Sequence, residues 1–279
     1  MTHLPPEPES WSIGAVDAFS WERFRRQWGR LLLAALLMGV AMIFIDAALE
    51  RAALRFFENL QRSPETELPE LLYQVVGTGT SLASWIAQGV LQLGFYVMML
   101  ELLREGETTL RPLFGQSHKL PKVALQTLAL WLVLDLPLTA WHHGLLQLVM
   151  SQLPAGALEG GDALAPGAVV ALGIGLLLAI VPYAYVAMGF MFAGLELADD
   201  DEVGALQAMR NSWRLVHGQR GRAFVFLPLT LLGLLAFCLG VVVTSVFAEL
   251  AFVALFLTLK DRAKPAGEEL AAIPAPASN

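Results

Sequence analysis

Long apolar runs are the feature that most constrains the fold of this chain. A bilayer core of about 30 Å needs about 20 apolar residues to be crossed by a helix. Five predominantly apolar runs have a length of this order, at residues 31–49, 75–103, 123–150, 168–197 and 223–259. Only 15% of the residues are charged, whereas a typical soluble domain carries about 25%. The sequence therefore predicts an all-α membrane protein.

The last of these runs is too long for one span. As a single helix it would measure about 55 Å, at about 1.5 Å per residue, which is far beyond the hydrocarbon core. We therefore predict a break near residues 240–245, giving two spans at 223–241 and 245–259. The fold prediction becomes a transmembrane bundle of six helices.

The basic residues predict the orientation of these spans. Cytoplasmic segments of membrane proteins are enriched in Lys and Arg. Six spans place 15 of the 18 basic residues on one side, and only Arg51, Arg55 and Arg62 on the other. Both termini are therefore predicted to be cytoplasmic, whereas five spans would put the basic C-terminal segment outside.

The six spans are predicted to form a single membrane domain over residues 11–263. The flanking segments 1–10 and 264–279 are rich in Pro, Ala and Glu, and we expect them to be disordered. The formal net charge is −7, which argues against a nucleic-acid partner because such proteins need a basic surface.

An internal repeat accompanies the spans. A shift of 192 residues aligns Ser20-Trp21 with Ser212-Trp213, and aligns the Gln-x-Gly-Arg segments that end at Arg30 and Arg222. Residues 110–122 occupy the equivalent place before the third span, without the Ser-Trp pair. The predicted organisation is three repeated units, each a cytoplasmic amphipathic helix followed by a transmembrane hairpin. Such repeats sometimes enclose a substrate path, but we favour duplication that simply built a stable bundle.

The second copy of the repeat has two different faces as a helix. The apolar residues Leu206, Met209, Trp213 and Val216 recur at helical spacing. The opposite side carries Arg210, Arg214 and His217. This pattern predicts an amphipathic helix that lies in the membrane interface.

The segment around the second copy also resembles a known family. Residues 194–218 combine an acidic turn with Ser-Trp-x-Leu-x-x-Gly ahead of a span, and similar segments begin at Ile13-Gly14 and at Gly106-Glu107. The chain thereby resembles uncharacterised bacterial polytopic inner-membrane proteins, similar to the membrane domain of some glycerophosphoryl diester phosphodiesterases and to the YciC-like family. The resemblance implies a six-helix protein of the bacterial inner membrane. It carries over no catalytic residue, because the six spans leave no room for the phosphodiesterase barrel.

Three acids lie inside the predicted spans, namely Asp46, Asp135 and Glu249. A charge at the bilayer centre costs about 2.5–3.5 kcal/mol on insertion scales, so each acid needs a partner or a function. His142 follows Asp135 on the same helical face, and Pro137 is expected to disturb the helix beside it. One interpretation is an intramembrane polar site for a proton or cation, built from Asp135, His142, Asp46 and Glu249. The alternative places Asp46 and Glu249 near the outer interface and has Asp135 neutral or hydrogen-bonded to a neighbouring helix, and we favour this alternative.

Two further features have two interpretations each. The acidic turn at residues 199–202 is suited either to a divalent cation or to the positive N-terminal end of the next helix, and we favour helix capping. Tyr183 and Tyr185 lie just after Pro182 and are suited to line a cavity or to pack in the bundle core. We favour the core, as is usual for buried aromatic residues.

Aromatic and basic residues gather at the predicted cytoplasmic interface. Tryptophan and arginine at this position anchor helices and attract anionic lipid head groups. The predicted lipid-interface residues are Trp21, Arg25, Arg26, Trp28, Arg30, Trp213, Arg214, Arg220 and Arg222.

Catalysis has no support in the sequence. The chain has one cysteine and shows no Ser-His-Asp, Cys-His or His-Glu-x-x-His arrangement. We expect a non-enzymatic integral inner-membrane protein without cofactor or metal, acting in envelope or lipid homeostasis, with membrane lipids and other envelope membrane proteins as partners. A small transporter or channel with Asp135 on its pathway is the alternative, and a membrane-embedded enzyme comes third.

Overall fold

A computed structural model describes residues 13–61, 70–152, 166–217 and 238–271 of the chain. These residues form helices, with no strand among them. Five of the helical segments are long and apolar enough to cross a membrane, at Gly14–Leu60, Leu72–Glu105, Arg111–Trp141, Gly173–Asp199 and Val243–Asp261. They confirm the all-α prediction and indicate a multi-pass membrane protein.

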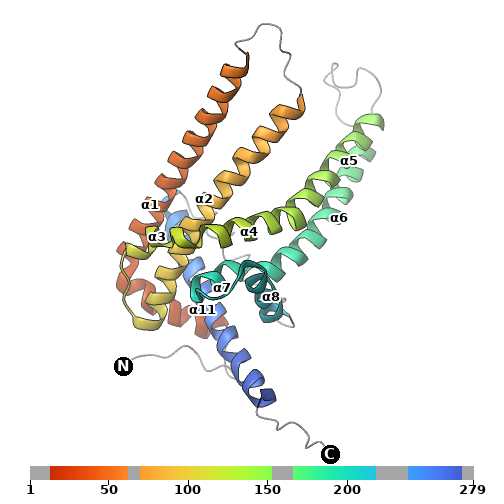
Figure 1. Cartoon of the computed structure of the whole chain (residues 1–279). Coiled ribbons are helices and arrows are strands. Elements are labelled where there is room, and N and C mark those ends of the chain that lie inside the picture. The colour runs from red at the N-terminus through yellow and green to blue at the C-terminus, as the bar shows by residue number, and fades with distance from the viewer. Residues whose placement is uncertain (1–12, 62–69, 153–165, 218–237, 272–279) are drawn as a thin grey trace, which may run out of the picture.

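The first hairpin pairs α1 (Ile13–Gln61) with α2 (Glu70–Glu105), which lie side by side in Figure 1. The predicted cytoplasmic segment and the first span are joined in α1, with a kink at Gln27 (φ −132°, ψ 18°). Arg30, just after the kink, donates hydrogen bonds to the Gln27 side chain (3.1 Å) and to the Thr108 carbonyl oxygen (3.0 Å). These contacts fix the kink against the segment that follows α2.

The second hairpin pairs the predicted third span with α6 (Pro166–Phe190), and it leans away from the first hairpin in Figure 1. The third span is divided into α4 (Leu120–Leu130), the π-helical turn η2 (Trp131–Asp135) and α5 (Leu136–Gln152). Pro137 explains the π turn, because its nitrogen has no hydrogen to donate and its ring collides with the carbonyl one turn earlier. The predicted disturbance beside Asp135 is therefore confirmed.

The last described helix corrects one prediction. α11 (Cys238–Ala271) is continuous, so the break predicted near residues 240–245 is wrong. A single glycine in that stretch costs a helix only about 1 kcal/mol, which is too little to interrupt it. Most of the predicted fifth span, 223–241, lies outside the described residues, so the count of six spans remains a prediction.

The two hairpins meet in a packed unit that we call the base. It consists of the N-terminal part of α1, the C-terminal half of α2 and the middle of α11, together with four short helices: α3 (Arg111–Gly115), η1 (Gln116–Lys119), α7 (Ala193–Asp199) and α8 (Ala205–Val216). Large side chains without solvent exposure, such as Met98, Phe192 and Phe256, fill it. Gly94 lets α3 approach α2, since a Cβ there would lie 2.7 Å from the Leu113 Cα.

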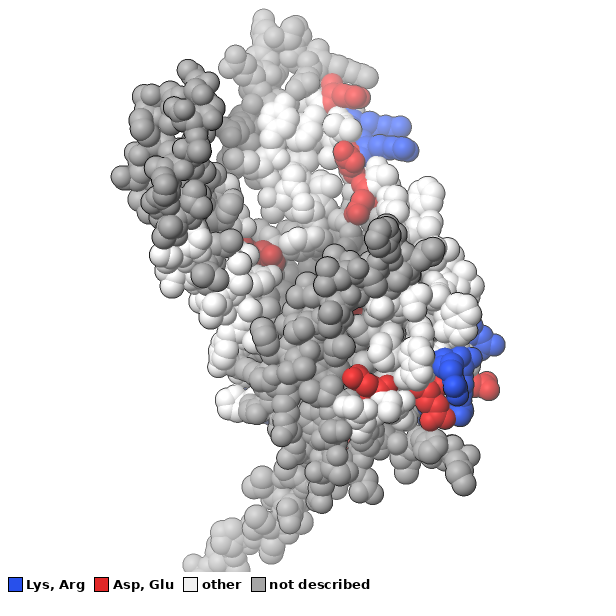
Figure 2. Space-filling model, turned by 180° about the vertical axis from the view of Figure 1, so that it is seen from behind, with Lys and Arg blue, Asp and Glu red and all other residues white. Residues whose placement is uncertain are grey.

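Beyond the base, the hairpins expose large apolar side chains. Ile43 and Phe44 of α1 are 68% and 71% exposed, as is expected of side chains that face lipid rather than water. Figure 2 shows Lys and Arg in two groups, one near the upper end and one at the base, with uncharged residues over most of the described surface between them. This distribution fits a chain that crosses an apolar layer between two polar ends.

Candidate functional site

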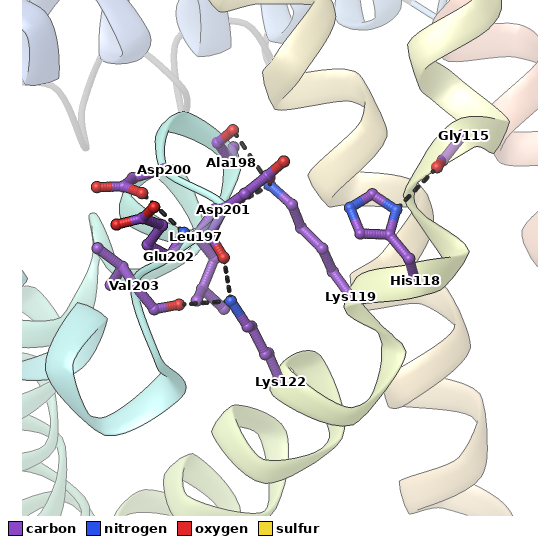
Figure 3. A network of polar contacts seen from close by, with 10 residues as sticks. All are labelled: Gly115, His118, Lys119, Lys122, Leu197, Ala198, Asp200, Asp201, Glu202 and Val203. Atoms are coloured by element: carbon purple, nitrogen blue, oxygen red, sulfur yellow. Dashed lines mark hydrogen bonds and ion pairs between the residues drawn. The ribbon is translucent and has the colours of Figure 1, made fainter.

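Two lysines hold the acidic loop between α7 and α8 (Figure 3). The Lys119 ammonium group donates to the Leu197 carbonyl oxygen at 2.6 Å and pairs with the Asp201 carboxylate at 2.5 Å, and its side chain is only 3% exposed. Lys122 donates to the carbonyl oxygens of Asp201 and Val203. Since both lysines come from η1 and α4, they tie the loop to the start of the second hairpin.

A second set of ion pairs joins three helices of the base. Asp199 of α7 pairs with Arg104 of α2 at 2.5 Å and with Lys260 of α11 at 2.8 Å. Lys260 also pairs with the buried Glu196 at 3.1 Å. Because Asp199 is only 7% exposed, these contacts connect α2, α7 and α11 through one buried carboxylate.

The ion pairs of Asp199 and Asp201 indicate the role of the acidic turn at residues 199–202. The capping prediction is wrong, because α8 begins after Gly204 and has no side-chain hydrogen bond at its N-terminal cap. In the part of the chain that the structure describes, no group of three His, Cys, Asp or Glu residues is suited to hold a metal ion. The hydrogen bond and the charge of Lys119 lower the pKa of Asp201 below its ordinary value, against a smaller effect of desolvation. The acidic turn therefore takes part in the ion pairs that hold the helices of the base together.

A stripe of polar residues on α2 forms hydrogen bonds with two of the three acids that lie in the predicted spans. Ser84, Gln88 and Gln92 recur every four residues and so lie on one face of the helix. Ser84 and Gln88 both donate to the Asp46 carboxylate, the latter at 3.2 Å. Gln92 donates to the Glu249 carboxylate at 3.1 Å. The four-residue spacing of polar side chains within an apolar helix was the signal in the sequence that could have located this stripe.

Asp135 lies apart from this stripe, in the second hairpin. It ends the η2 turn. A cavity of about 350 Å³ in the same hairpin is lined by Leu134, Pro137, Trp141 and Tyr183 among others, but not by Asp135. The Trp141 indole donates to the Gly175 carbonyl oxygen at 3.1 Å and so joins α5 to α6. The structure thus brings Asp46 and Glu249 to α2 and leaves Asp135 on a different helix pair. His142 is part of α5, but its side chain lies outside what the structure describes.

The two tyrosines near Pro182 have different surroundings. Tyr183 lines the cavity between α5 and α6. Tyr185 is 52% exposed and lies 6.4 Å from the Trp213 ring, measured between ring centroids. The core interpretation is therefore wrong for Tyr185, and for Tyr183 the structure favours the cavity-lining alternative.

The predicted lipid-interface residues of α1 are exposed at the base. Trp21 and Trp28 are 53% and 55% exposed, and Arg25 and Arg26 are exposed as well. Trp21 also packs edge-on against Phe247 of α11, with 5.5 Å between ring centroids. Of the other predicted interface residues, Arg30 contacts Thr108, Arg214 is exposed, and Arg220 and Arg222 lie outside the described residues.

The second copy of the Ser-Trp pair lies on α8. Trp213 is partly buried against Phe190, with 5.3 Å between ring centroids. The serines of both copies are fully buried: Ser20 donates to the Val16 carbonyl oxygen at 2.7 Å, and Ser212 to that of Gly189 at 2.9 Å. The two copies therefore share a buried serine beside an aromatic contact with another helix.

The predicted apolar face of α8 is only partly buried. Met209 and Val216 are buried, while Leu206 is 63% exposed. Arg210 and Arg214, on the predicted polar side, are exposed. An apolar face that lies toward lipid or toward the bundle allows both positions, so Leu206 in the first turn of α8 does not contradict the predicted amphipathic helix, which stays a prediction.

Comparison with protein-family models, with curated proteins and with solved structures finds no match to this chain.

Proposed function

We propose that this chain is a non-enzymatic integral protein of the bacterial inner membrane, with six spans and with the base on the cytoplasmic side. Its role would be in envelope or lipid homeostasis, as a scaffold for lipids and for another membrane protein. The observation that carries this proposal is the ionic network of the base. Asp199 joins α2, α7 and α11, and Lys119 fixes the acidic loop, so the base forms one unit below diverging hairpins.

The edge of the base supports the lipid part of the proposal. The exposed indoles of Trp21 and Trp28 lie on the same short stretch of α1 as the exposed guanidinium groups of Arg25 and Arg26. Indoles favour the head-group region, and basic side chains attract anionic lipids. The buried serines of the two Ser-Trp copies support the internal repeat, in which an amphipathic helix precedes each transmembrane hairpin.

Retention of lipid by the purified full chain tests the lipid role. Native mass spectrometry would compare the wild type with the double variant Arg25→Gln, Arg26→Gln in nanodiscs that contain phosphatidylglycerol. A basic residue near an anionic surface contributes about 1 kcal/mol, so we expect several-fold less bound phosphatidylglycerol. The matched control is Arg51→Gln, Arg55→Gln at the exposed far end of α1. Equal losses in both double variants would contradict a lipid-binding base.

Transport is the second candidate, and one observation favours it. Asp135 ends a π-helical turn, and π turns often accompany functional sites. Its neighbours Leu134 and Pro137 line a cavity of about 350 Å³, although Asp135 itself does not. In reconstituted liposomes, a transporter would lose its proton or cation flux in the variant Asp135→Asn while keeping its thermal stability. Unchanged flux in that variant would remove Asp135 from the pathway.

A further inference from the structure

The cavity of the second hairpin lies where a proline interrupts each of its helices. α5 and α6 lie side by side (Figure 1), and Pro137 near the start of α5 and Pro182 inside α6 both line the space between them. Its volume of about 350 Å³ is at the lower end of the range of about 300–1,000 Å³ that is usual for small-molecule sites. The apolar lining residues are Val133, Leu134, Leu138, Leu178, Ala179 and Val186. These walls are suited to an apolar chain.

Apolar contact alone does not select an occupant for this cavity. Both helices belong to segments apolar enough to cross a membrane, and lipid tails are as apolar as leucine. A lipid chain therefore gains little when it moves from the bilayer into the cavity. A particular lipid is preferred only if it also finds a polar contact there.

Pro182 provides such a contact because it leaves a backbone oxygen free. Proline has no N–H, so Pro182 cannot donate to the carbonyl oxygen one turn earlier in α6, which is that of Leu178. Leu178 and Pro182 both line the cavity, so this oxygen lies at its wall. A backbone acceptor without a partner is costly in an apolar layer, and the occupant is therefore expected to carry a hydrogen-bond donor.

Two lining side chains are polar among those that the structure describes, namely Trp141 and Tyr183. The Trp141 indole already donates to the Gly175 carbonyl oxygen at 3.1 Å. Tyr183 directly follows Pro182, and its hydroxyl can donate as well as accept. A hydroxyl group on the occupant matches both features, since it donates to the Leu178 carbonyl oxygen and accepts from Tyr183.

The charge of the occupant follows from the lining and from its depth. The lining residues carry no charge, and Asp135, next to Leu134 in the sequence, is not among them. Pro182 lies near the middle of an apolar segment, Gly173–Asp199, where a charged head group would be costly. We propose that the cavity between α5 and α6 binds a neutral single-chain lipid with a free hydroxyl group, held by the Leu178 carbonyl oxygen and Tyr183. This site extends the proposed lipid role and rests on its membrane-spanning hairpins, but not on lipid binding at the base.

Native mass spectrometry of the purified full chain in detergent tests the hydrogen bond to Leu178. The probes are oleyl alcohol and oleyl methyl ether, which have the same chain, but the ether has no O–H to donate. The wild type is expected to bind the alcohol at least about threefold more tightly, equivalent to about 0.6 kcal/mol. Pro182→Ala restores the N–H for the Leu178 carbonyl oxygen and should abolish this preference. Pro121→Ala is the matched control, because a first-turn N–H of α4 has no partner within the helix, and it should keep the preference.

A second pair of variants tests the position of the site. Ala179→Phe fills the cavity and should prevent binding of the alcohol, whereas Ile180→Phe, at an exposed neighbour outside the lining, should not. Tyr183→Phe should weaken binding of both probes and keep the preference between them. Equal binding of the two probes by the wild type would overturn the proposal, as would an unchanged preference in Pro182→Ala or equal binding of the alcohol by Ala179→Phe and Ile180→Phe.

The double variant Arg25→Gln, Arg26→Gln separates this site from the base. It should keep the preference for the alcohol while it loses phosphatidylglycerol. A wild type that prefers the alcohol but retains phosphatidylglycerol no better than this variant would contradict lipid binding at the base and leave the cavity site supported.

Discussion

The buried carboxylate of Asp199 is predicted to be a main source of stability in the base. Its side chain is 7% exposed and pairs with Lys260, which is 24% exposed, and with Arg104, which is 49% exposed. The half-exposed pair with Arg104 is worth about 0.2–1 kcal/mol. The better buried contact with Lys260 is a hydrogen bond between charged groups, worth about 1.5–3 kcal/mol.

Asp199→Asn removes the charge and keeps the size of the side chain. Lys260 retains its contact with Glu196, so the expected loss lies near the middle of the summed range, at about 2–3 kcal/mol in the free energy of unfolding. The assay is unfolding of the purified chain in detergent. Asp200→Asn is the matched control, because Asp200 is an exposed neighbour whose substitution should change stability by less than about 0.5 kcal/mol.

A double-mutant cycle with Lys260→Met identifies the cause of this loss. If Asp199 acts through Lys260, the two substitutions are non-additive, with a coupling of about 0.5–3 kcal/mol. The reasoning is refuted if Asp199→Asn is as stable as Asp200→Asn, or if the effects of Asp199→Asn and Lys260→Met simply add.

Two further predictions concern packing and pH. Gly94→Ala should destabilise the chain by about 1–3 kcal/mol, because its Cβ would lie 2.7 Å from backbone atoms of Leu113. Gly115→Ala is the control: its Cβ would meet nothing within 4 Å, so it should be tolerated in the same melting assay. Equal stability of the two variants would contradict the close approach of α3 to α2. Lys119 lowers the folded-state pKa of Asp201 below the ordinary 3.8. The stability that this ion pair contributes is therefore present above pH 3.8 and is lost as the pH falls through the lowered pKa. Acid melting curves that are the same for the wild type and Asp201→Asn would contradict this pairing.

The sequence predicted the helices better than their contacts. Apolar runs mark helices because hydrophobicity is a local property, and Pro137 correctly located the disturbance beside Asp135. The break near Gly240 was wrong because span length alone does not say where a helix ends. Hydropathy gives no position for a turn inside an apolar run.

The ionic network could not be predicted from spacing. Lys119 pairs with Asp201, and Arg104 with Asp199, only because folding brings distant segments together in the base. The polar stripe of α2 is different, since its four-residue spacing is visible in the sequence. Its partners Asp46 and Glu249 come from other helices, so their arrangement around α2 required the structure.

In the proposed topology the hairpins cross the membrane and the base faces the cytoplasm. Cysteine labelling in intact cells tests it most directly, with Cys238 replaced by Ala and one new cysteine per variant. Glu58→Cys lies at the exposed far end of α1, and Ser117→Cys lies on the exposed surface of η1 in the base. A membrane-impermeant maleimide is expected to label the first variant in intact cells and the second only after permeabilisation. Labelling of Ser117→Cys in intact cells would contradict it.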